Sequence, residues 1–132
     1  MRLVLIIPAI AVFLFFLFGC GNTHSAFISQ EEMELLSDMH DDLVILDVRE
    51  HFELSGPLGK IEGAINIPLG QLKDEITGLH PDRDTAIVIY CRTRNRSRAA
   101  YEELGRMGYT RLYVLLGGMT DYDHGGQFPG DK

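Results

Sequence analysis

Three continuous apolar segments constrain the fold of this chain more than any other feature of its sequence. They are "DDLVILDV" (residues 41–48), "TAIVIY" (85–90) and "RLYVLL" (111–116). Apolar runs without polar alternation are typical of strands that are buried on both faces of a sheet. Between these runs, residues 70–79 and 97–108 have the pattern of helices. The alternation of strands and helices predicts an α/β fold, in which an open parallel sheet carries helices on both faces.

A further helix is predicted ahead of the first apolar run, in "SQEEMELLSDM" (residues 29–39). Ser29 is in position to cap this helix, and Glu32, three residues later, completes the pattern of a capping box. Apolar side chains recur along the segment at helical spacing, namely Met33, Leu36 and Met39.

The length and composition of the chain are those of one globular domain. It has 132 residues, of which 45% are hydrophobic and 23% are charged. Lys and Arg together number 12, against 19 Asp and Glu, so the formal net charge is -7. General nucleic-acid binders usually carry a basic excess spread over one face. The acidic balance therefore argues against nucleic acid as a partner.

The N-terminal residues have the pattern of a secretory signal peptide. Arg2 is followed by an uncharged and mostly apolar stretch from Leu3 to Phe18. The stretch is somewhat short for a membrane span, which usually needs about 20 residues, although an uncleaved anchor reaching to Gly21 also fits it. "LFGC" (residues 17–20) resembles the lipobox of bacterial lipoproteins, in which a peptidase cuts before a cysteine that carries a diacylglycerol.

This resemblance divides the chain into three parts. Residues 1–19 form the signal peptide, residues 20–26 hold the lipidated Cys20 and a short polar tether, and residues 27–132 form the domain. The acyl chains that the resemblance implies on Cys20 exceed the two signals needed for stable anchoring at a bilayer. We therefore expect an exported protein that is lipid-anchored to the cell envelope, on the periplasmic or extracellular face of a bacterial membrane.

Cys91 stands where an open parallel sheet binds its ligands. It directly follows the apolar run 85–90 and precedes a helix that is expected to begin near Ser97. Its sulfur should therefore face the N–H groups of a turn and the positive end of a helix dipole. With Cys20 lipidated, Cys91 is the only thiol of the processed chain, so no internal disulfide is expected.

Four arginines lie close together in "YCRTRNRSR" (residues 90–98), and no acidic residue stands among them. In an acidic protein such a cluster favours a local role, either stabilising a thiolate or recruiting a small anion. Arginine grips oxyanions with a planar fork of N–H donors. The loop is therefore a candidate site for nucleophilic chemistry on an anionic substrate.

The loop also resembles that of a known family. "CRTRNRS" (residues 91–97) is similar to the active-site loop of the rhodanese family of sulfurtransferases, usually C-R-[ST]-G-x-R-S. "LDVRE" (46–50) matches the Asp-x-Arg segment of the family, and "GKIEGAINIPL" (59–69) matches its G-H-I-x-G-A-x-N-I-P signature. "LLGGMTDY" (115–122) matches the closing L-x-G-G-x-x-x-W. The motifs occur in the family order over about residues 27–129, which implies a rhodanese-like α/β fold.

The resemblance implies a chemistry and a set of site residues. Cys91 is expected to be the catalytic nucleophile, taking a sulfane sulfur from thiosulfate or another anionic donor and carrying it as a persulfide. Cyanide, a thiol or a protein thiol then accepts the sulfur, and no cofactor is needed. Arg96 is the better candidate for donor binding. The substrate-binding residues expected from the loop are Arg92, Thr93, Arg94, Asn95, Arg96 and Ser97, of which Ser97 either caps the helix or bonds near the sulfur.

Two further residues are expected to support the loop, and three depart from the family pattern. Asp47 and Arg49 lie at the end of a strand, where a structural ion pair is the favoured role. Arg94 stands where the family commonly has Gly, so it either offsets the strain of a positive φ or adopts another backbone shape. Lys60 replaces the usual His and Tyr122 the usual Trp, both as tolerable changes on a packed flank.

Two rival functions follow from the same residues. The first is a membrane-tethered sulfur-carrier or interaction module that has little turnover of small molecules. The second is a cysteine phosphatase or arsenate reductase, which is disfavoured because phosphatases place an arginine six residues after the cysteine, where this chain has Ser97. The histidines show no metal-binding spacing, so no metal site is predicted.

Overall fold

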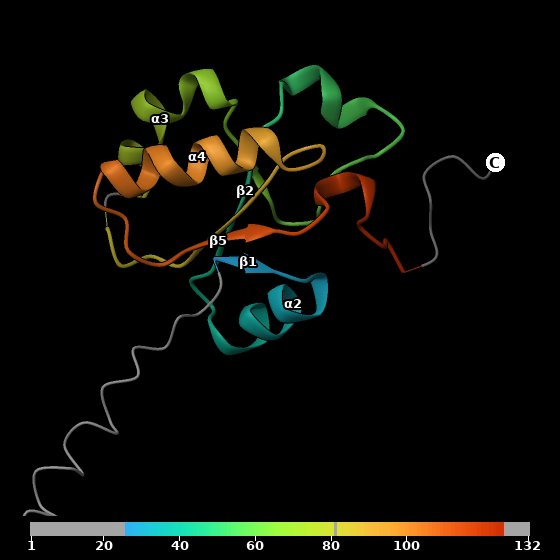
Figure 1. Ribbon diagram of the computed structural model, residues 1–132, viewed down its shortest axis with the longest axis horizontal. Helices are drawn as coiled ribbons and strands as arrows, with labels where there is room; N and C mark the ends of the chain where they lie inside the picture. The colour runs from blue at the N-terminus through green and yellow to red at the C-terminus, as the bar shows by residue number, and fades with distance from the viewer. Residues whose placement is uncertain (1–25, 81, 126–132) are drawn as a thin grey trace, which may run out of the picture.

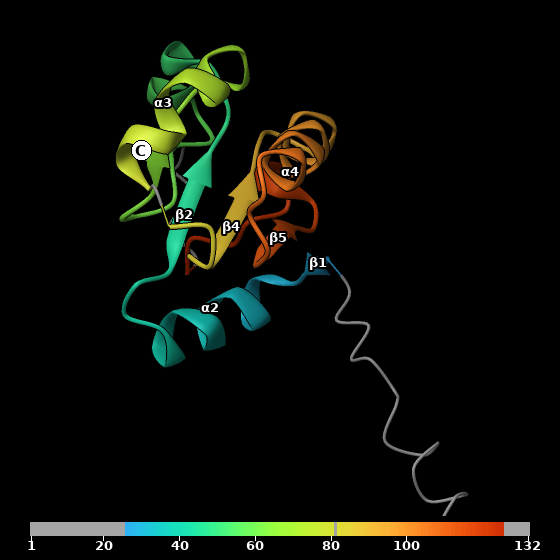
Figure 2. The same cartoon turned by 90° about the vertical axis from the view of Figure 1, so that its left-hand side faces the viewer.

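The protein is described by a computed structural model, which covers residues 26–80 and 82–125. A five-stranded parallel sheet forms its centre, with the strand order β1-β5-β4-β2-β3 (Figures 1 and 2). The three apolar runs form its three central strands, as predicted. The strands are β1 (Phe27–Ile28), β2 (Val44–Asp47), β3 (Ile65–Asn66), β4 (Ile87–Tyr90) and β5 (Leu112–Leu115).

Helices cover both faces of the sheet, which confirms the predicted α/β fold. In Figures 1 and 2, α3 and α4 lie together on one side of the strands, and α2 lies on the other. All three helices were predicted from the sequence. The helices are α2 (Gln30–Met39), α3 (Leu72–Leu79) and α4 (Asn95–Arg106), and the short 3-10 helices are η1 (His51–Ser55), η2 (Leu69–Gln71) and η3 (Gly118–Thr120).

The central strand β4 divides the hydrophobic core into two layers. Alternate side chains of a strand point to opposite faces of the sheet. Ile87 and Ile89 therefore pack in the cluster that includes residues of α3 and α4, and Cys91 continues that side. Val88 and Tyr90 pack in the cluster that includes Met33 of α2. Every residue of β4 is fully buried, as expected for an apolar run without polar alternation.

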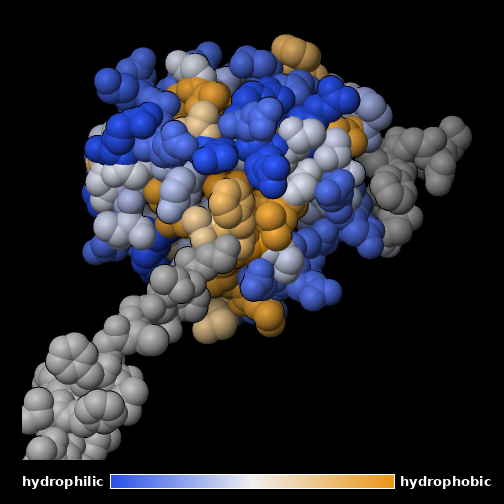
Figure 3. Space-filling view, viewed as in Figure 1, coloured by the Kyte–Doolittle hydropathy of each residue, from blue (hydrophilic) through white to orange (hydrophobic). Residues whose placement is uncertain are grey.

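The capping box of α2 is present as predicted, but the buried stripe of this helix is shorter than expected. The Ser29 backbone N–H donates to Glu32 Oε2 at 2.8 Å, and the Glu32 N–H donates to Ser29 Oγ at 3.2 Å. Met33 is buried, whereas Met39 is 74% exposed. Met39 and Leu35 line an apolar groove beside β1, near the point where the described chain begins (Figure 3).

The N-terminal predictions fall outside this part of the chain. The signal peptide (residues 1–19), Cys20 and all of the tether except residue 26 lie outside the described residues. Among the residues that are described, no helix is both long and apolar enough to cross a bilayer.

Gly118 brings the turn after β5 against the loop after β4. Gly117 and Gly118 both have positive φ, at 71° and 56°. A Cβ atom on Gly118 would lie 2.5 Å from the Thr93 carbonyl oxygen and 2.6 Å from the Cys91 carbonyl oxygen. No side chain fits at such a distance from backbone atoms, so only glycine allows this approach. The two glycines therefore form a tight turn beside the loop.

We predict that Gly118→Ala destabilises the protein by about 3 kcal/mol or more, because it adds a backbone clash to the strain of a positive φ. Gly63→Ala is the matched control, since Gly63 has φ 76° but no atom within 4 Å of an added Cβ. Its cost should be only about 1 kcal/mol. Urea unfolding of both variants measures the difference, and equal losses would contradict the close approach at Gly118.

Candidate active site

Cys91 lies between the end of β4 and the start of α4, as the sequence predicted. The residue is 1% exposed. Its thiol donates to Ser97 Oγ at 3.5 Å, and Ser97 Oγ donates to the Arg94 carbonyl oxygen at 2.9 Å. The expectation that Ser97 caps the helix is wrong, because α4 begins at Asn95 and Ser97 lies within its first turn. Ser97 instead fulfils the alternative, a hydrogen bond next to the sulfur.

The backbone of the loop is held by η3. The N–H of Met119 donates to the Cys91 carbonyl, and the N–H of Thr120 donates to the Arg92 carbonyl, both at 3.0 Å. In a trans peptide the N–H points away from the carbonyl oxygen. The N–H groups of Arg92 and Thr93 therefore point away from η3.

The N–H groups of the loop are available to an anion. No hydrogen bond within the described chain engages the backbone N–H groups of residues 92–97. Those in the first turn of α4 have no acceptor within the helix, as at any helix N-terminus. Together with the positive end of the helix dipole, they favour a negative charge at this edge of the sheet. This arrangement is the one that the sequence predicted around Cys91.

The backbone of Arg94 shows which of the two expected conformations this residue adopts. Its φ is -154° and its ψ is -26°, and no described residue other than glycine has a positive φ. Because this φ is negative, the first of the two alternatives, a strained positive φ, is excluded. Arg94 adopts another backbone shape and stores no strain of this type.

The loop presents most of its predicted binding residues to solvent. Four consecutive residues are exposed, namely Arg92, Thr93, Arg94 and Asn95. Within the described residues, the side chains of Arg92 and Arg94 make no hydrogen bond or ion pair. Arg98 is also exposed and lies 3.6 Å from Glu102, one turn along α4. The unpaired charges of the cluster are therefore those of Arg92 and Arg94.

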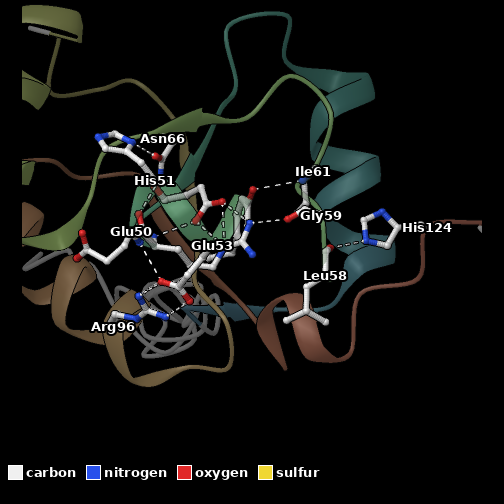
Figure 4. A network of polar contacts seen from close by, with 12 residues as sticks. Glu50, His51, Glu53, Leu58, Gly59, Ile61, Asn66, Arg96 and His124 are labelled. Carbon is white, nitrogen blue, oxygen red and sulfur yellow. Dashed lines mark hydrogen bonds and ion pairs between the residues drawn. The ribbon is translucent and has the colours of Figure 1, made fainter. Parts of the chain in front are cut away.

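Arg96, the residue expected to bind the donor, is paired with Glu53 of η1. Nη2 of Arg96 donates to Glu53 Oε1 at 2.8 Å, and Nη1 donates to Oε2 (Figure 4). The Glu50 N–H donates to the same Oε2 at 2.9 Å, so the carboxylate is fixed from two sides. No local sequence pattern indicates this pair, because its members are separated by 43 residues.

The pair shifts the ionisation of both partners. The hydrogen bonds from Arg96 lower the pKa of Glu53 to about 2, against the opposing effect of burial. The hydrogen bond to Glu53 is also the main cause that raises the pKa of Arg96 above its ordinary value. A negative charge on Cys91 would raise the pKa of Arg96 in the same direction. Arg96 directly precedes Ser97, whose hydroxyl contacts the sulfur. Both groups of the pair are charged at neutral pH.

Asp47 and Arg49 form the buried ion pair that the sequence favoured. Both side chains are 1% exposed, and Nη2 of Arg49 donates to Asp47 Oδ2 at 2.7 Å. The same nitrogen donates to the Gly59 carbonyl at 2.8 Å, and Nε contacts both carboxylate oxygens. Burial lowers the pKa of Arg49, but its hydrogen bonds and attraction to Asp47 outweigh that effect and raise it. The Arg49 guanidinium lies 5.6 Å from the centre of the Tyr90 ring.

Asn66 stabilises the same strand end, a role that was not predicted from the sequence. Its side-chain N–H groups donate to the carbonyl oxygens of Asp47 and Arg49, both at 2.9 Å. Its Oδ1 lies 2.6 Å from His51 Nδ1 at the start of η1. Asn66 lies within "GAINIP", a motif that the sequence shows, but the motif alone does not indicate which groups the side chain bonds. Asn66 therefore connects β3 to the segment that carries Glu53.

Comparison with known proteins assigns the family. The family model of the rhodanese-like domain matches residues 30–124. The chain belongs to this family. Among solved structures, a rhodanese-related protein from Thermoplasma volcanium aligns with a TM-score of 0.58 and 32% identity, covering 75% of this chain and 91% of that one. The rhodanese-like fold expected from the motifs is therefore confirmed.

Two curated relatives show a similar degree of likeness. Thiosulfate sulfurtransferase PspE of Escherichia coli (strain K12) is 39% identical over 61 residues, which are 46% of this chain and 58% of that protein. The uncharacterized protein YqhL of Bacillus subtilis (strain 168) is 38% identical over 88 residues, which are 67% of this chain and 65% of that protein. The rhodanese-like chain thus aligns with less than two thirds of either relative.

We predict that Glu53→Gln lowers the free energy of unfolding at pH 7 by about 1 kcal/mol. The expected loss is this small because both side chains of the ion pair are partly exposed, and solvent screens their attraction. The pKa of Glu53 is lower in the folded state than its ordinary value of about 4.5. The charged pair therefore stabilises the fold above about pH 4.5, and this contribution is lost as the pH falls towards 2.

Urea unfolding at pH 7, 4 and 3 measures this difference between the wild type and the variant. The difference should shrink as the pH falls, while the other carboxyl groups are common to both proteins. A difference that stays constant over this range would contradict the assigned pKa shift.

Proposed function

We propose that this rhodanese-like protein is a sulfurtransferase that moves a sulfane sulfur from an anionic donor such as thiosulfate to a thiophilic acceptor. One observation carries the proposal. The Cys91 thiol lies at the start of α4, beside Ser97, where no described residue engages the loop N–H groups or pairs with Arg92 and Arg94. The family and the name of one relative, a thiosulfate sulfurtransferase, support the same chemistry.

The reaction has two steps in which atoms and electrons balance. The Cys91 thiolate attacks the outer sulfur of thiosulfate, a sulfur–sulfur bond forms, and sulfite leaves with the electron pair of the broken bond. The resulting Cys91 persulfide then gives its outer sulfur to cyanide, a thiol or a protein thiol, and the Cys91 thiolate is restored. Both the thiolate and the persulfide are anions, so the loop must stabilise negative charge throughout the cycle.

The residues of the loop have distinct proposed roles in this cycle. The N–H groups of residues 92–97 and the N-terminus of α4 stabilise the anionic sulfur. Arg92 and Arg94 supply charge for the oxygen-bearing end of the donor, since their side chains are exposed and unpaired. Thr93 and Asn95 contribute backbone groups, and the Ser97 hydroxyl orients the sulfur.

We further propose that the protein is exported and held at a bacterial membrane by lipid on Cys20. The support is the sequence "LFGC" after the apolar stretch from Leu3 to Phe18. A lipid anchor followed by a short tether restricts the domain to the membrane surface. The sulfur acceptor would then be a molecule that reaches this surface.

For the anchor, we predict that Cys20→Ala blocks processing and leaves a longer precursor in a bacterial host. Intact mass spectrometry of the membrane fraction measures both proteins. The wild type should lose residues 1–19 and gain the mass of its acyl chains. An unmodified wild-type mass would show that "LFGC" is not used.

For the chemistry, we predict that Cys91→Ser abolishes sulfur transfer and leaves the fold intact, because a hydroxyl forms no persulfide and the change in volume is small. The full-length protein in detergent is incubated with thiosulfate and cyanide, and thiocyanate is measured beside the intact mass. The wild type should gain the mass of one sulfur atom at Cys91 and turn over.

The outcomes separate the rival functions. A sulfur adduct on Cys91 without thiocyanate production would support a carrier that delivers sulfur to a protein partner. Turnover that persists in Cys91→Ser would remove Cys91 from the mechanism. Hydrolysis of a phosphate ester by the wild type, absent from Cys91→Ser, would favour a phosphatase.

A further inference from the structure

The Glu53–Arg96 pair joins the candidate loop to a different part of the fold. Glu53 belongs to η1, which follows β2, whereas Arg96 lies in the first turn of α4. The Glu50 N–H also donates to one carboxylate oxygen of Glu53. The carboxylate is therefore held by the backbone of its own segment as well as by Arg96.

The pair changes how much charge the loop offers to an anion. Three arginines, Arg92, Arg94 and Arg96, lie between Cys91 and Ser97, and Glu53 neutralises one of them. A guanidinium has five N–H donors, and the two hydrogen bonds to Glu53 use one donor on each terminal nitrogen. Arg96 thus keeps donors on its remaining side, but its positive charge is balanced. An approaching anion is attracted mainly by the other two.

We propose that Glu53 is a positioning residue that masks the charge of Arg96 and so limits the affinity of the loop for anions that approach Cys91. The proposal rests on the proposed sulfurtransferase function only for the identity of the anion. A masked arginine would weaken the hold on the anionic donor. It would also weaken binding of the anionic product of the first step, because donor and product are attracted by the same positive charges of the loop. The product would then block the site less.

Glu53→Gln tests the proposal, because glutamine has nearly the same shape and lacks the charge. The probe is the ratio of two rates at Cys91, alkylation by the anion iodoacetate and by the neutral iodoacetamide. Both reagents react with the same thiolate, so a change in its reactivity cancels in the ratio. The full-length protein is used, and mass spectrometry of the peptide that contains Cys91 separates it from Cys20.

Two variants serve as controls. Glu102→Gln removes a carboxylate from Arg98, another arginine of the same cluster, but this pair lies on the exposed surface of α4. Glu102→Gln should leave the ratio of alkylation rates unchanged, because solvent screens the charge of the exposed Glu102 side chain. Glu53→Gln combined with Arg96→Gln should return the ratio to about the wild-type value, because the two side chains are then again neutral as a pair.

Glu53→Gln is expected to raise the iodoacetate to iodoacetamide ratio by about three- to tenfold, as one unmasked charge near the sulfur would do. The KM for thiosulfate should fall by a similar factor. An unchanged ratio would mean that the pair is only structural. A lower ratio would mean that Glu53 aims Arg96 at the anion, and either result overturns the proposal.

The two readouts also distinguish this proposal from the proposed function. If the wild type does not turn over thiosulfate, the sulfurtransferase proposal fails, and the alkylation ratio still tests the masking. If the wild type turns over and the ratio does not rise, the masking fails alone.

Discussion

The buried ion pair between Asp47 and Arg49 is the interaction on which the edge of the sheet depends. Both side chains are 1% exposed, and removal of two charges from water costs several kcal/mol each. Hydrogen bonds offset that cost, because Arg49 donates to both oxygens of Asp47 and to the Gly59 carbonyl. In the described residues, no buried side-chain nitrogen or oxygen is left without a partner. Loss of either partner would leave an uncompensated charge, which typically costs 3–5 kcal/mol.

The ion pair also determines where the residues around Cys91 lie. Asp47 is paired in register with Tyr90, the residue before Cys91, so the ends of β2 and β4 are fixed together. Arg49 is followed by Glu50, whose N–H holds Glu53, and Asn66 ties the same carbonyl groups to β3. The position of Glu53 beside Arg96 thus follows from contacts at the end of β2. The loop after Cys91 is supported from this side by η1 and from the other by η3.

The sequence predicted those parts of the fold and the site that depend on local pattern. Apolar runs located the three central strands, helical spacing located the three helices, and the capping box of α2 was read from Ser29 and Glu32. The strands β1 and β3 have two residues each, too few for any periodicity to be visible. The Glu53–Arg96 pair joins residues that are distant in the chain, and only the fold brings them together. The sequence left two alternatives open for the backbone of Arg94, because the family preference for Gly does not fix the φ of the residue that replaces it.

The N-terminus of α4 carries charges of the sign that is unfavourable at this end of a helix. Helices favour acidic side chains in the first turn, because the dipole is positive there, and each unfavourable charge typically costs 0.3–1 kcal/mol. Yet α4 has Arg94 at its N-cap, Arg96 and Arg98 just after it, no acidic residue in its first turn and no side-chain hydrogen bond at the cap. Glu53 relieves part of this repulsion from outside the helix. Arg94 and the dipole remain uncompensated by the described residues, so an anion bound at Cys91 would stabilise the helix that binds it.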